Sequence, residues 1–316
     1  MGSAAPTKTY DVLIIGAGPA GLSAALGLAR QCYSALVFDS SKYRNAPADH
    51  IHNIITWDHR NPADFRAAGR ANILSRYPSI SFRDAEVTSA AKLDDGSFEL
   101  TDASQETYRG KVLMLASGVT DVMLPIPGYT ELWGKSIFHC LFCHGFEEKG
   151  ATNAGVLAAG LINQPSMILH MARMATNLVK DVTVYCDGDQ EVATTMQEAF
   201  KGKPLTIEGK KIVKLEKGAT DEDVTVHLEG GEVRKERFLV SVPTTMNNGS
   251  FVKDLNLETE PFGFIKVTPP FNETSVPGVF AIGDCATMMK AAPNAINMGS
   301  FGAAGAVAKL ASMGKL

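Results

Sequence analysis

A strand–helix–strand unit near the N-terminus constrains the fold of this chain more than any other feature. Residues 10–40 contain an apolar run, 12–15, which breaks at the glycine-rich stretch GAGPAG and continues as an Ala/Leu-rich segment, 20–30. A second apolar run, 35–38, follows and ends at Asp39. Short apolar runs of this kind are typical of buried parallel strands. The pattern therefore predicts two parallel strands joined by a helix, a unit of about 30 residues.

The glycines of GAGPAG stand at the spacing of a dinucleotide-binding turn. Gly16 permits the tight turn, Gly18 lets the backbone approach a pyrophosphate, and Gly21 allows the helix to pack closely on the strand. Free N–H groups at the helix start would face the phosphates. Asp39, at the end of the second strand, suits a ribose hydroxyl. The alternative is a glycine turn needed only for packing. We predict that the following residues bind a dinucleotide: Gly16, Gly18, Pro19, Ala20, Gly21, Asp39 and Ser40.

A second unit of the same kind is expected in the middle of the chain. The apolar run 155–160, the helical pattern 165–178 and the run 181–189 repeat the order strand, helix, strand. An apolar strand within 274–286 and a small-residue helix over 294–311 then finish the chain. The sequence thus predicts an α/β protein with one dinucleotide-type unit nested inside another.

Composition limits the classes of partner. The chain has 316 residues, 45% of them hydrophobic and 20% charged, which is enough for two domains with buried cores. A net charge of -4 gives no reason to expect nucleic acid or an anionic membrane as a partner. No apolar stretch approaches a membrane span of roughly 18 residues, and the polar N-terminus shows no secretory signal. With only five cysteines, a reducing compartment and a cytoplasmic location are expected.

The stretch FHCLFCHGF carries the chemistry that most needs explanation. Cys140 and Cys143 are separated by two apolar residues and flanked by His139 and His144. Such a pair can be a redox centre, half of a metal site, or a coincidence. The remaining cysteines are scattered singly rather than paired at metal-ligand spacing, so we predict no metal site.

Four motifs resemble the low-molecular-weight thioredoxin reductases in sequence and in order. They are DVLIIGAGPAGLSAA, LASG at 115–118, the Cys-x-x-Cys and TSVPGVFAIGDCA. The resemblance implies two nested Rossmann-like domains of the three-layer ββα type. Residues 1–122 and 246–316 would form an FAD-binding domain, and residues 123–245 an inserted domain that resembles an NADPH domain. It also implies FAD contacts at Asn53, Val87, Ala116, Gly118, Asp284 and Ala295.

The nested unit departs from that family where NADPH would bind. Its strand ends in Ala158, Ala159 and Gly160, and LINQPS replaces the rest of the glycine fingerprint. The partner strand ends with Asp187 and Asp189 and offers no Arg or Lys for a 2′-phosphate. We therefore expect NADPH binding to be lost. Charge alone does not exclude NADH, although the altered turn argues against it.

A branch of the family fits a chain without a nicotinamide donor. The stretches TWDHRNPADFRAA, HCLFCHGFEEKG and TPPFNETSVPGVFAIGDCA resemble fungal dithiol oxidases that close the disulfide of gliotoxin-type metabolites. The resemblance implies a small apolar dithiol as substrate, molecular oxygen as electron acceptor, H2O2 as by-product, and a homodimer. Two alternatives remain open: an NAD(P)H-dependent thioredoxin-type reductase, and a flavin-binding redox sensor without turnover.

The expected mechanism assigns each side chain of the Cys-x-x-Cys segment a role. A substrate thiolate attacks Cys140, and Cys143, the sulfur nearer the flavin in the family, receives the electrons. A helix start close to the pair would lower the thiol pKa. Imidazole titrates near neutral pH, so a histidine suits the role of base. The resemblance makes His144 the first choice and His139 the second, because His144 falls where thioredoxin reductases usually carry an acid–base Asp. The two residues between the cysteines, 141 and 142, would present an apolar surface.

Overall fold

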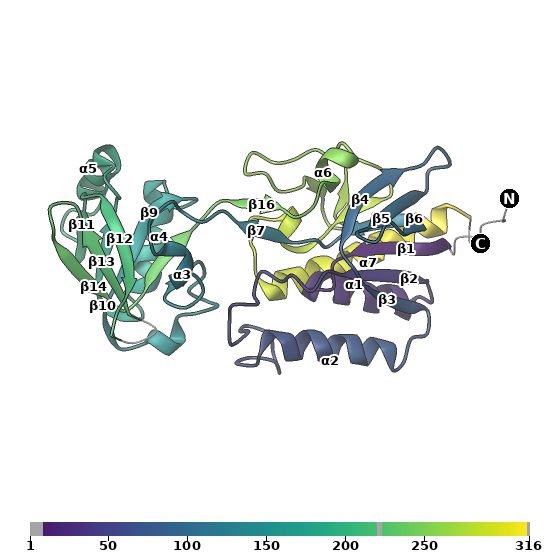
Figure 1. Ribbon diagram of the computed structural model, residues 1–316, viewed down its shortest axis with the longest axis horizontal. Coiled ribbons are helices and arrows are strands. Elements are labelled where there is room, and N and C mark those ends of the chain that lie inside the picture. The colour runs from purple at the N-terminus through teal and green to yellow at the C-terminus, as the bar shows by residue number, and fades with distance from the viewer. Residues whose placement is uncertain (1–8, 220–222, 315–316) are drawn as a thin grey trace. The chain divides into compact units, whose positions relative to one another are not determined.

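The computed structural model describes residues 9–219 and 223–314. The chain divides into two compact units, Met1–Thr120 with Thr245–Leu316, and Asp121–Thr244 (Figure 1). The domain borders expected from the sequence, after residues 122 and 245, lie close to these crossings. One unit is thus inserted into the other, as the repeated strand–helix–strand pattern indicates.

The first unit is built on a nine-stranded sheet. The strands along its main path are in the order β17-β18-β19-β6-β1-β2-β3, and β5 pairs with both β6 and β4. Its strands are β1 (Thr9–Ile15), β2 (Ala35–Asp39), β3 (Ile80–Asp84), β4 (Val87–Lys92), β5 (Phe98–Asp102), β6 (Thr107–Leu115), β17 (Val267–Thr268), β18 (Glu273–Thr274) and β19 (Val279–Ala281). Its helices are α1 (Pro19–Arg30), α2 (Pro62–Leu74), α6 (Phe251–Asp254), the 3-10 turn η2 (Gly283–Ala286) and α7 (Ala292–Ser312).

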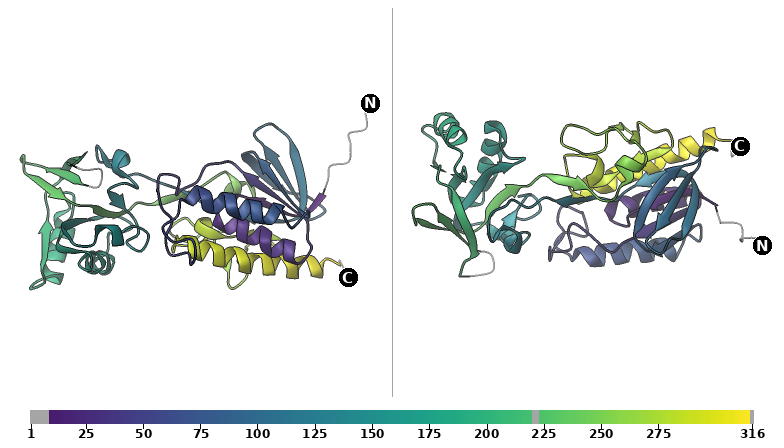
Figure 2. Two further views of the ribbon diagram at one scale, coloured as in Figure 1. Left: turned by 90° about the horizontal axis from the view of Figure 1, so that it is seen from below. Right: turned by 45° about the horizontal axis from the view of Figure 1, so that its top comes forward.

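Helices α1, α2 and α7 lie side by side along one face of this sheet (Figures 1 and 2). The core strands read as continuous apolar runs because both faces are covered: all five residues of β2 are buried. Small residues let α1 and α7 approach closely, since a Cβ on Gly27 would lie 2.7 Å from the Cβ of Ala303. The antiparallel strands β4 and β5 provide the further layer, so the predicted α/β architecture is confirmed.

The direction of the parallel strands places their carboxyl ends along one edge of the sheet. β1, β2, β6 and β19 run parallel to one another in the sheet. Their carboxyl ends, at Ile15, Asp39, Leu115 and Ala281, therefore lie along the same edge. In open α/β sheets, ligands bind at this edge.

The second unit carries a five-stranded parallel sheet, in the order β11-β10-β9-β15-β8, and an antiparallel sheet, β12-β13-β14. Its strands are β8 (Ile137–Phe138), β9 (Ala151–Gly160), β10 (Val179–Tyr185), β11 (Leu205–Glu208), β12 (Ile212–Lys217), β13 (Val224–Leu228), β14 (Val233–Glu236) and β15 (Leu239–Val242). Its helices are α3 (Tyr129–Leu132), the 3-10 turn η1 (Phe146–Glu148), α4 (Pro165–Ala175) and α5 (Gln190–Ala199). Strands β7 (Val119–Asp121) and β16 (Thr245–Asn247), which pair with each other, lie where the chain crosses between units.

No helix within residues 9–219 and 223–314 combines the length and the apolar character needed to cross a membrane.

Candidate functional site

The turn between β1 and α1 has the geometry that a phosphate cradle requires. Gly16 has a φ of 111°, and a Cβ there would lie 2.2 Å from the carbonyl oxygen of Ala116. A Cβ on Gly21 would lie 1.9 Å from the carbonyl oxygen of Gly16. Both positions therefore need glycine for the protein's own packing. A Cβ on Gly18, in contrast, would meet no protein atom within 4 Å. Gly18 thus borders open space, where the backbone can approach a ligand.

The amino end of α1 supplies the donors for such a ligand. Gly18 is the N-cap residue, so no side chain at this position caps the helix, and Pro19 occupies the first turn. The first intrahelical bond runs from the N–H of Leu22 to the carbonyl of Gly18. The N–H groups of Ala20 and Gly21 precede it and have no intrahelical acceptor. Together with the positive end of the helix dipole, they fit the pyrophosphate of a dinucleotide.

Asp39 lies where a ribose would be recognised, and the structure shows what orients it. Its carboxylate is buried and accepts hydrogen bonds from the N–H of Ser41, at 2.9 Å, and from the hydroxyl of Tyr43, at 2.7 and 2.6 Å. Burial, together with the hydrogen bond to Asp39, raises the pKa of Tyr43 well above its ordinary value, so Tyr43 stays a donor. An ionised carboxylate has about four acceptor sites, which leaves capacity for a ribose hydroxyl. Ser40, the next residue, is exposed.

Three further predicted contacts converge on the same corner of the first unit. Ala116 follows β6, and its backbone packs against Gly16. A Cβ on Gly283 would lie 2.9 Å from the Cβ of Ala20 and 3.7 Å from the Cβ of Ala295. Asp284 is therefore adjacent in sequence to a residue that touches both α1 and the first turn of α7. The structure brings Ala116, Ala295 and Asp284 to the phosphate cradle.

Arg44 is a residue of this corner that the sequence did not reveal. Its Nη1 lies 3.1 Å from Oδ2 of Asp284, and the two side chains are only 15% and 21% exposed. The pair joins the loop after β2 to the loop after β19, 240 positions apart. Arg44 sits in a polar loop with no recognisable motif, so nothing in the sequence marked it. Its guanidinium adds positive charge to a site that fits an anionic cofactor.

The other predicted flavin contacts lie in different settings. Gly118 has a φ of 66° and follows the end of β6. Val87 is the first residue of β4 and is buried. Asn53 is exposed, has a φ of 63°, and donates its backbone N–H to Asp58 at 2.8 Å. Their roles as flavin contacts stay predictions.

Cys140 and Cys143 are joined by a disulfide, with their Cα atoms 5.2 Å apart. Both residues are half-buried. The carbonyl of Cys140 accepts from the N–H groups of Cys143, at 3.1 Å, and His144, at 3.0 Å, which closes a tight turn around the bond. The closed disulfide favours the redox interpretation, because a metal half-site needs both sulfurs as thiolates.

Both histidines that flank the cysteine pair stack on aromatic rings of the second unit. The ring of His144 stacks on Phe138, with centroids 5.0 Å apart and 7° between the planes. The ring of His139 stacks on Trp133 at 5.8 Å. His144 is also tied to Cys140 through its backbone. The choice between the two as base stays a prediction.

Two expectations about the Cys-x-x-Cys segment are wrong. The pair does not stand at the start of an α-helix: the element that follows is η1, a single 3-10 turn of three residues. Leu141 is 7% exposed and packs in the core, so it does not contribute to an apolar surface. Phe142 is 73% exposed and Phe146 is 77% exposed, and these two residues present the apolar surface instead.

The nested unit lacks a phosphate cradle at the end of β9. The N–H of Leu161 donates to the carbonyl of Val242, and the N–H of Ile162 to the carbonyl of Ala159. These two N–H groups are therefore already bonded within the protein, and the side chain of Ile162 is fully buried in the core of the nested unit. Helix α4 then begins at Pro165, with no side-chain cap from Gln164.

The acidic residues after β10 have structural partners. Asp187 accepts the N–H of Ile212 at 2.8 Å, and Asp189 caps α5 by accepting the N–H of Val192 at 3.0 Å. One cation that the sequence reading missed lies beside them: a Cβ on Gly188 would lie 3.3 Å from the Cβ of Lys211. Lys211 arrives from the loop before β12, which is why the β10 sequence gave no sign of it.

Comparison with known proteins places these features in a family. The family model for pyridine nucleotide-disulphide oxidoreductases matches residues 10–299. The chain is 46% identical to thioredoxin reductase aclD of Aspergillus oryzae, over 96% of each chain. It is 45% identical to thioredoxin reductase tcpT of Claviceps purpurea, over 93% of this chain and 92% of that one.

A solved oxidoreductase from Agrobacterium tumefaciens shares the fold. It is 29% identical, with a TM-score of 0.84, and the match covers 96% of this chain and 99% of that chain. The resemblance seen in the sequence motifs is thereby confirmed. The chain belongs to the pyridine nucleotide-disulphide oxidoreductase family, as a relative of fungal thioredoxin-reductase-like proteins.

Proposed function

We propose that this oxidoreductase is an FAD-dependent dithiol oxidase. Its substrate is a small apolar dithiol of the gliotoxin type, which it converts to an intramolecular disulfide, with O2 as electron acceptor and H2O2 as by-product. The observation that carries the proposal is the turn after β9, where the N–H groups of Leu161 and Ile162 bond to protein carbonyls instead of facing a phosphate. Without a nicotinamide donor, a dithiol substrate is an electron source that the Cys140–Cys143 disulfide can accept directly.

The side chains of the Cys-x-x-Cys segment can perform the exchange. A substrate thiolate attacks Sγ of Cys140, the Cys140–Cys143 bond breaks, and Cys143 leaves as a thiolate. The second substrate thiol then attacks the substrate sulfur of the mixed disulfide, which closes the product ring and releases Cys140. The substrate loses two protons and two electrons. His144 is the first choice to accept a proton, because its backbone ties it to Cys140.

The corner formed by the β1–α1 turn fits the cofactor. Gly18, Ala20 and Gly21 would hold the pyrophosphate of the cofactor. Asp39 would bind its ribose, and Arg44 with Asp284 would bind the polar part of the cofactor next to the pyrophosphate. When bound, FAD supplies a two-electron acceptor that returns the cysteine pair to the disulfide and delivers the electrons to O2.

Exposed aromatic residues support a small apolar substrate. Phe142 lies between the two cysteines and Phe146 follows shortly after them, both largely exposed. Apolar side chains beside a reactive bond favour a compact hydrophobic molecule, because they lose water contact when it binds. We also propose a homodimer, as the family resemblance implies.

A second candidate is an NAD(P)H-dependent disulfide reductase. The curated relatives aclD and tcpT are both named thioredoxin reductases. Lys211 beside the β10 turn supplies a cation that could meet a nucleotide phosphate. The internal hydrogen bonds of the turn at Leu161 and Ile162 weigh against this candidate.

Oxygen uptake tests the proposed function. The FAD-loaded protein should consume O2 in the presence of butanedithiol, and Cys140→Ser and Cys143→Ser should each reduce the rate to that of free flavin. Cys32→Ser is the matched control, because Cys32 is an exposed free thiol of the other unit. Equal rates in all three variants, or no uptake by the parent protein, would refute the oxidase.

A further inference from the structure

A ten-residue hairpin in the first unit holds two histidines opposite each other. Ile51 and Arg60 form an antiparallel bridge, in which the N–H of Ile51 donates to the carbonyl of Arg60 at 2.7 Å. The N–H of His59 donates to the carbonyl of Ile51 at 2.9 Å. Ile51 is buried and anchors the neck of the hairpin. His52 and His59 follow the bridge as the next facing pair, a position in which side chains interact across strands.

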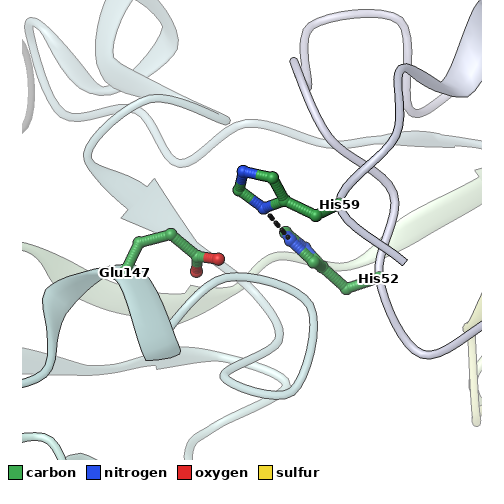
Figure 3. A group of neighbouring side chains, drawn as sticks. All are labelled: His52, His59 and Glu147. Atoms are coloured by element: carbon green, nitrogen blue, oxygen red, sulfur yellow. Dashed lines mark hydrogen bonds between the residues drawn. The ribbon is translucent and has the colours of Figure 1, made fainter.

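The two imidazoles meet at a distance suited to sharing one ion. Nε2 of His52 and Nδ1 of His59 lie 3.1 Å apart and share a hydrogen bond (Figure 3). Two nitrogen ligands at about 2.0–2.1 Å from a tetrahedral ion stand about 3.3 Å apart. The ring of His50 stacks on that of His59, with centroids 4.0 Å apart and 8° between the planes, and so fixes its orientation.

Backbone strain in the hairpin supports a specific role. Asn53, Thr56 and His59 have φ values of 63°, 73° and 59°. A left-handed conformation is unfavourable for residues with a Cβ, and most of all for a β-branched residue such as Thr56. Strained residues persist where the surrounding structure fixes them, and they gather at binding sites.

We propose that His52 and His59 bind a divalent transition-metal ion of the zinc class, with water completing its coordination. Imidazole is a ligand that zinc, copper and nickel ions prefer. His50 is a positioning residue that supports His59 by stacking. The prediction of no metal site rested on the scattered cysteines. His52 and His59 are seven positions apart in a loop, and the Ile51–Arg60 bridge brings them together. The site does not depend on the proposed oxidase function.

Zinc titration by calorimetry tests the site. The protein is FAD-loaded, carries Cys32→Ser and is kept free of reductant, so that the Cys140–Cys143 disulfide and the absence of an exposed thiol remove sulfur ligands. We expect one Zn²⁺ per chain, with affinity at least about tenfold lower in His52→Ala and in His59→Asn. Asn is chosen at position 59 because it tolerates positive φ. His170→Ala is the control, since His170 is exposed on α4.

A second readout keeps the proposal falsifiable if a variant fails to fold. With Cu²⁺ bound to the parent protein, electron paramagnetic resonance should show coupling to two imidazole nitrogens. Absence of saturable Zn²⁺ binding by the parent, affinity unchanged in both variants, or copper spectra without nitrogen coupling would each overturn the site. His50→Ala should weaken binding less than the ligand variants do, because His50 only packs on His59.

Discussion

Arg44 and Asp284 link two loops that the chain places far apart. Their side chains are mostly buried, and the ion pair sets the carboxylate of Asp284 in a fixed orientation beside Gly283. Removal of one partner from such a pair leaves the other charge poorly solvated. The pair therefore matters both for the stability of the corner and for the cofactor that we expect there.

Arg44→Ala should release flavin. We expect at least about a tenfold loss of flavin affinity and a loss of about 1–2 kcal/mol in the free energy of unfolding, because Asp284 is left without its cation. The flavin-to-protein absorbance ratio after gel filtration and a denaturant titration measure the two effects. Arg76→Ala, at an exposed position, is the control. Full flavin retention by Arg44→Ala would show that the guanidinium has no part in the site.

The three free cysteines should differ sharply in reactivity. Burial, reinforced by Asp189 and Glu208, raises the pKa of Cys186 to about 11. Burial, with Asp284 nearby, does the same for Cys285. Only Cys32 is exposed. A thiol reagent at about pH 8 should therefore label one cysteine in the oxidised native protein and three after unfolding.

The same shifts set a direction for stability with pH. The folded state keeps the thiols of Cys186 and Cys285 protonated above the ordinary cysteine pKa of 9.0. Their contribution to the free energy of unfolding is therefore complete below about pH 9 and is lost as the pH rises toward about 11. Rapid labelling of three thiols in the native protein would contradict their burial.

At the scale of single elements, the β1–α1 turn separates glycines needed for packing from the one that faces open space. The spacing in the sequence predicts all three, because a dinucleotide turn leaves few choices. Other elements could not be read in this way. The turn around Cys140 and Cys143 depends on backbone hydrogen bonds that no residue pattern encodes, which is why a helix start was wrongly expected there.

Two glycine variants should separate fold from binding. Gly21→Ala should lower the free energy of unfolding by about 1–3 kcal/mol, since its Cβ would overlap the carbonyl of Gly16. Gly18→Ala should change apoprotein stability by less than about 0.5 kcal/mol, because its Cβ meets no protein atom, yet weaken flavin binding. Denaturant titration of the apoproteins and flavin titration measure both. Unchanged flavin affinity in Gly18→Ala would remove the cradle from the cofactor site.

At the scale of the whole molecule, nested units could be predicted because each repeats a strand–helix–strand pattern with strongly apolar strands. The contributions of Arg44 and Lys211 could not be predicted, because each reaches its place through tertiary structure: Arg44 through the ion pair to Asp284 and Lys211 through packing against Gly188. The proximity of the two histidines could not be predicted for the same reason, since the Ile51–Arg60 bridge makes their rings neighbours.

The source of electrons is the central claim, and anaerobic stopped-flow mixing tests it most directly. The oxidised FAD-loaded protein is mixed with butanedithiol, with NADPH or with NADH, and the visible flavin absorbance is followed. The account predicts rapid bleaching by the dithiol and none by NADPH, because the N–H groups of Leu161 and Ile162 after β9 are bonded to protein carbonyls and do not face a phosphate. Bleaching by NADPH as fast as by the dithiol would contradict the account and identify a reductase.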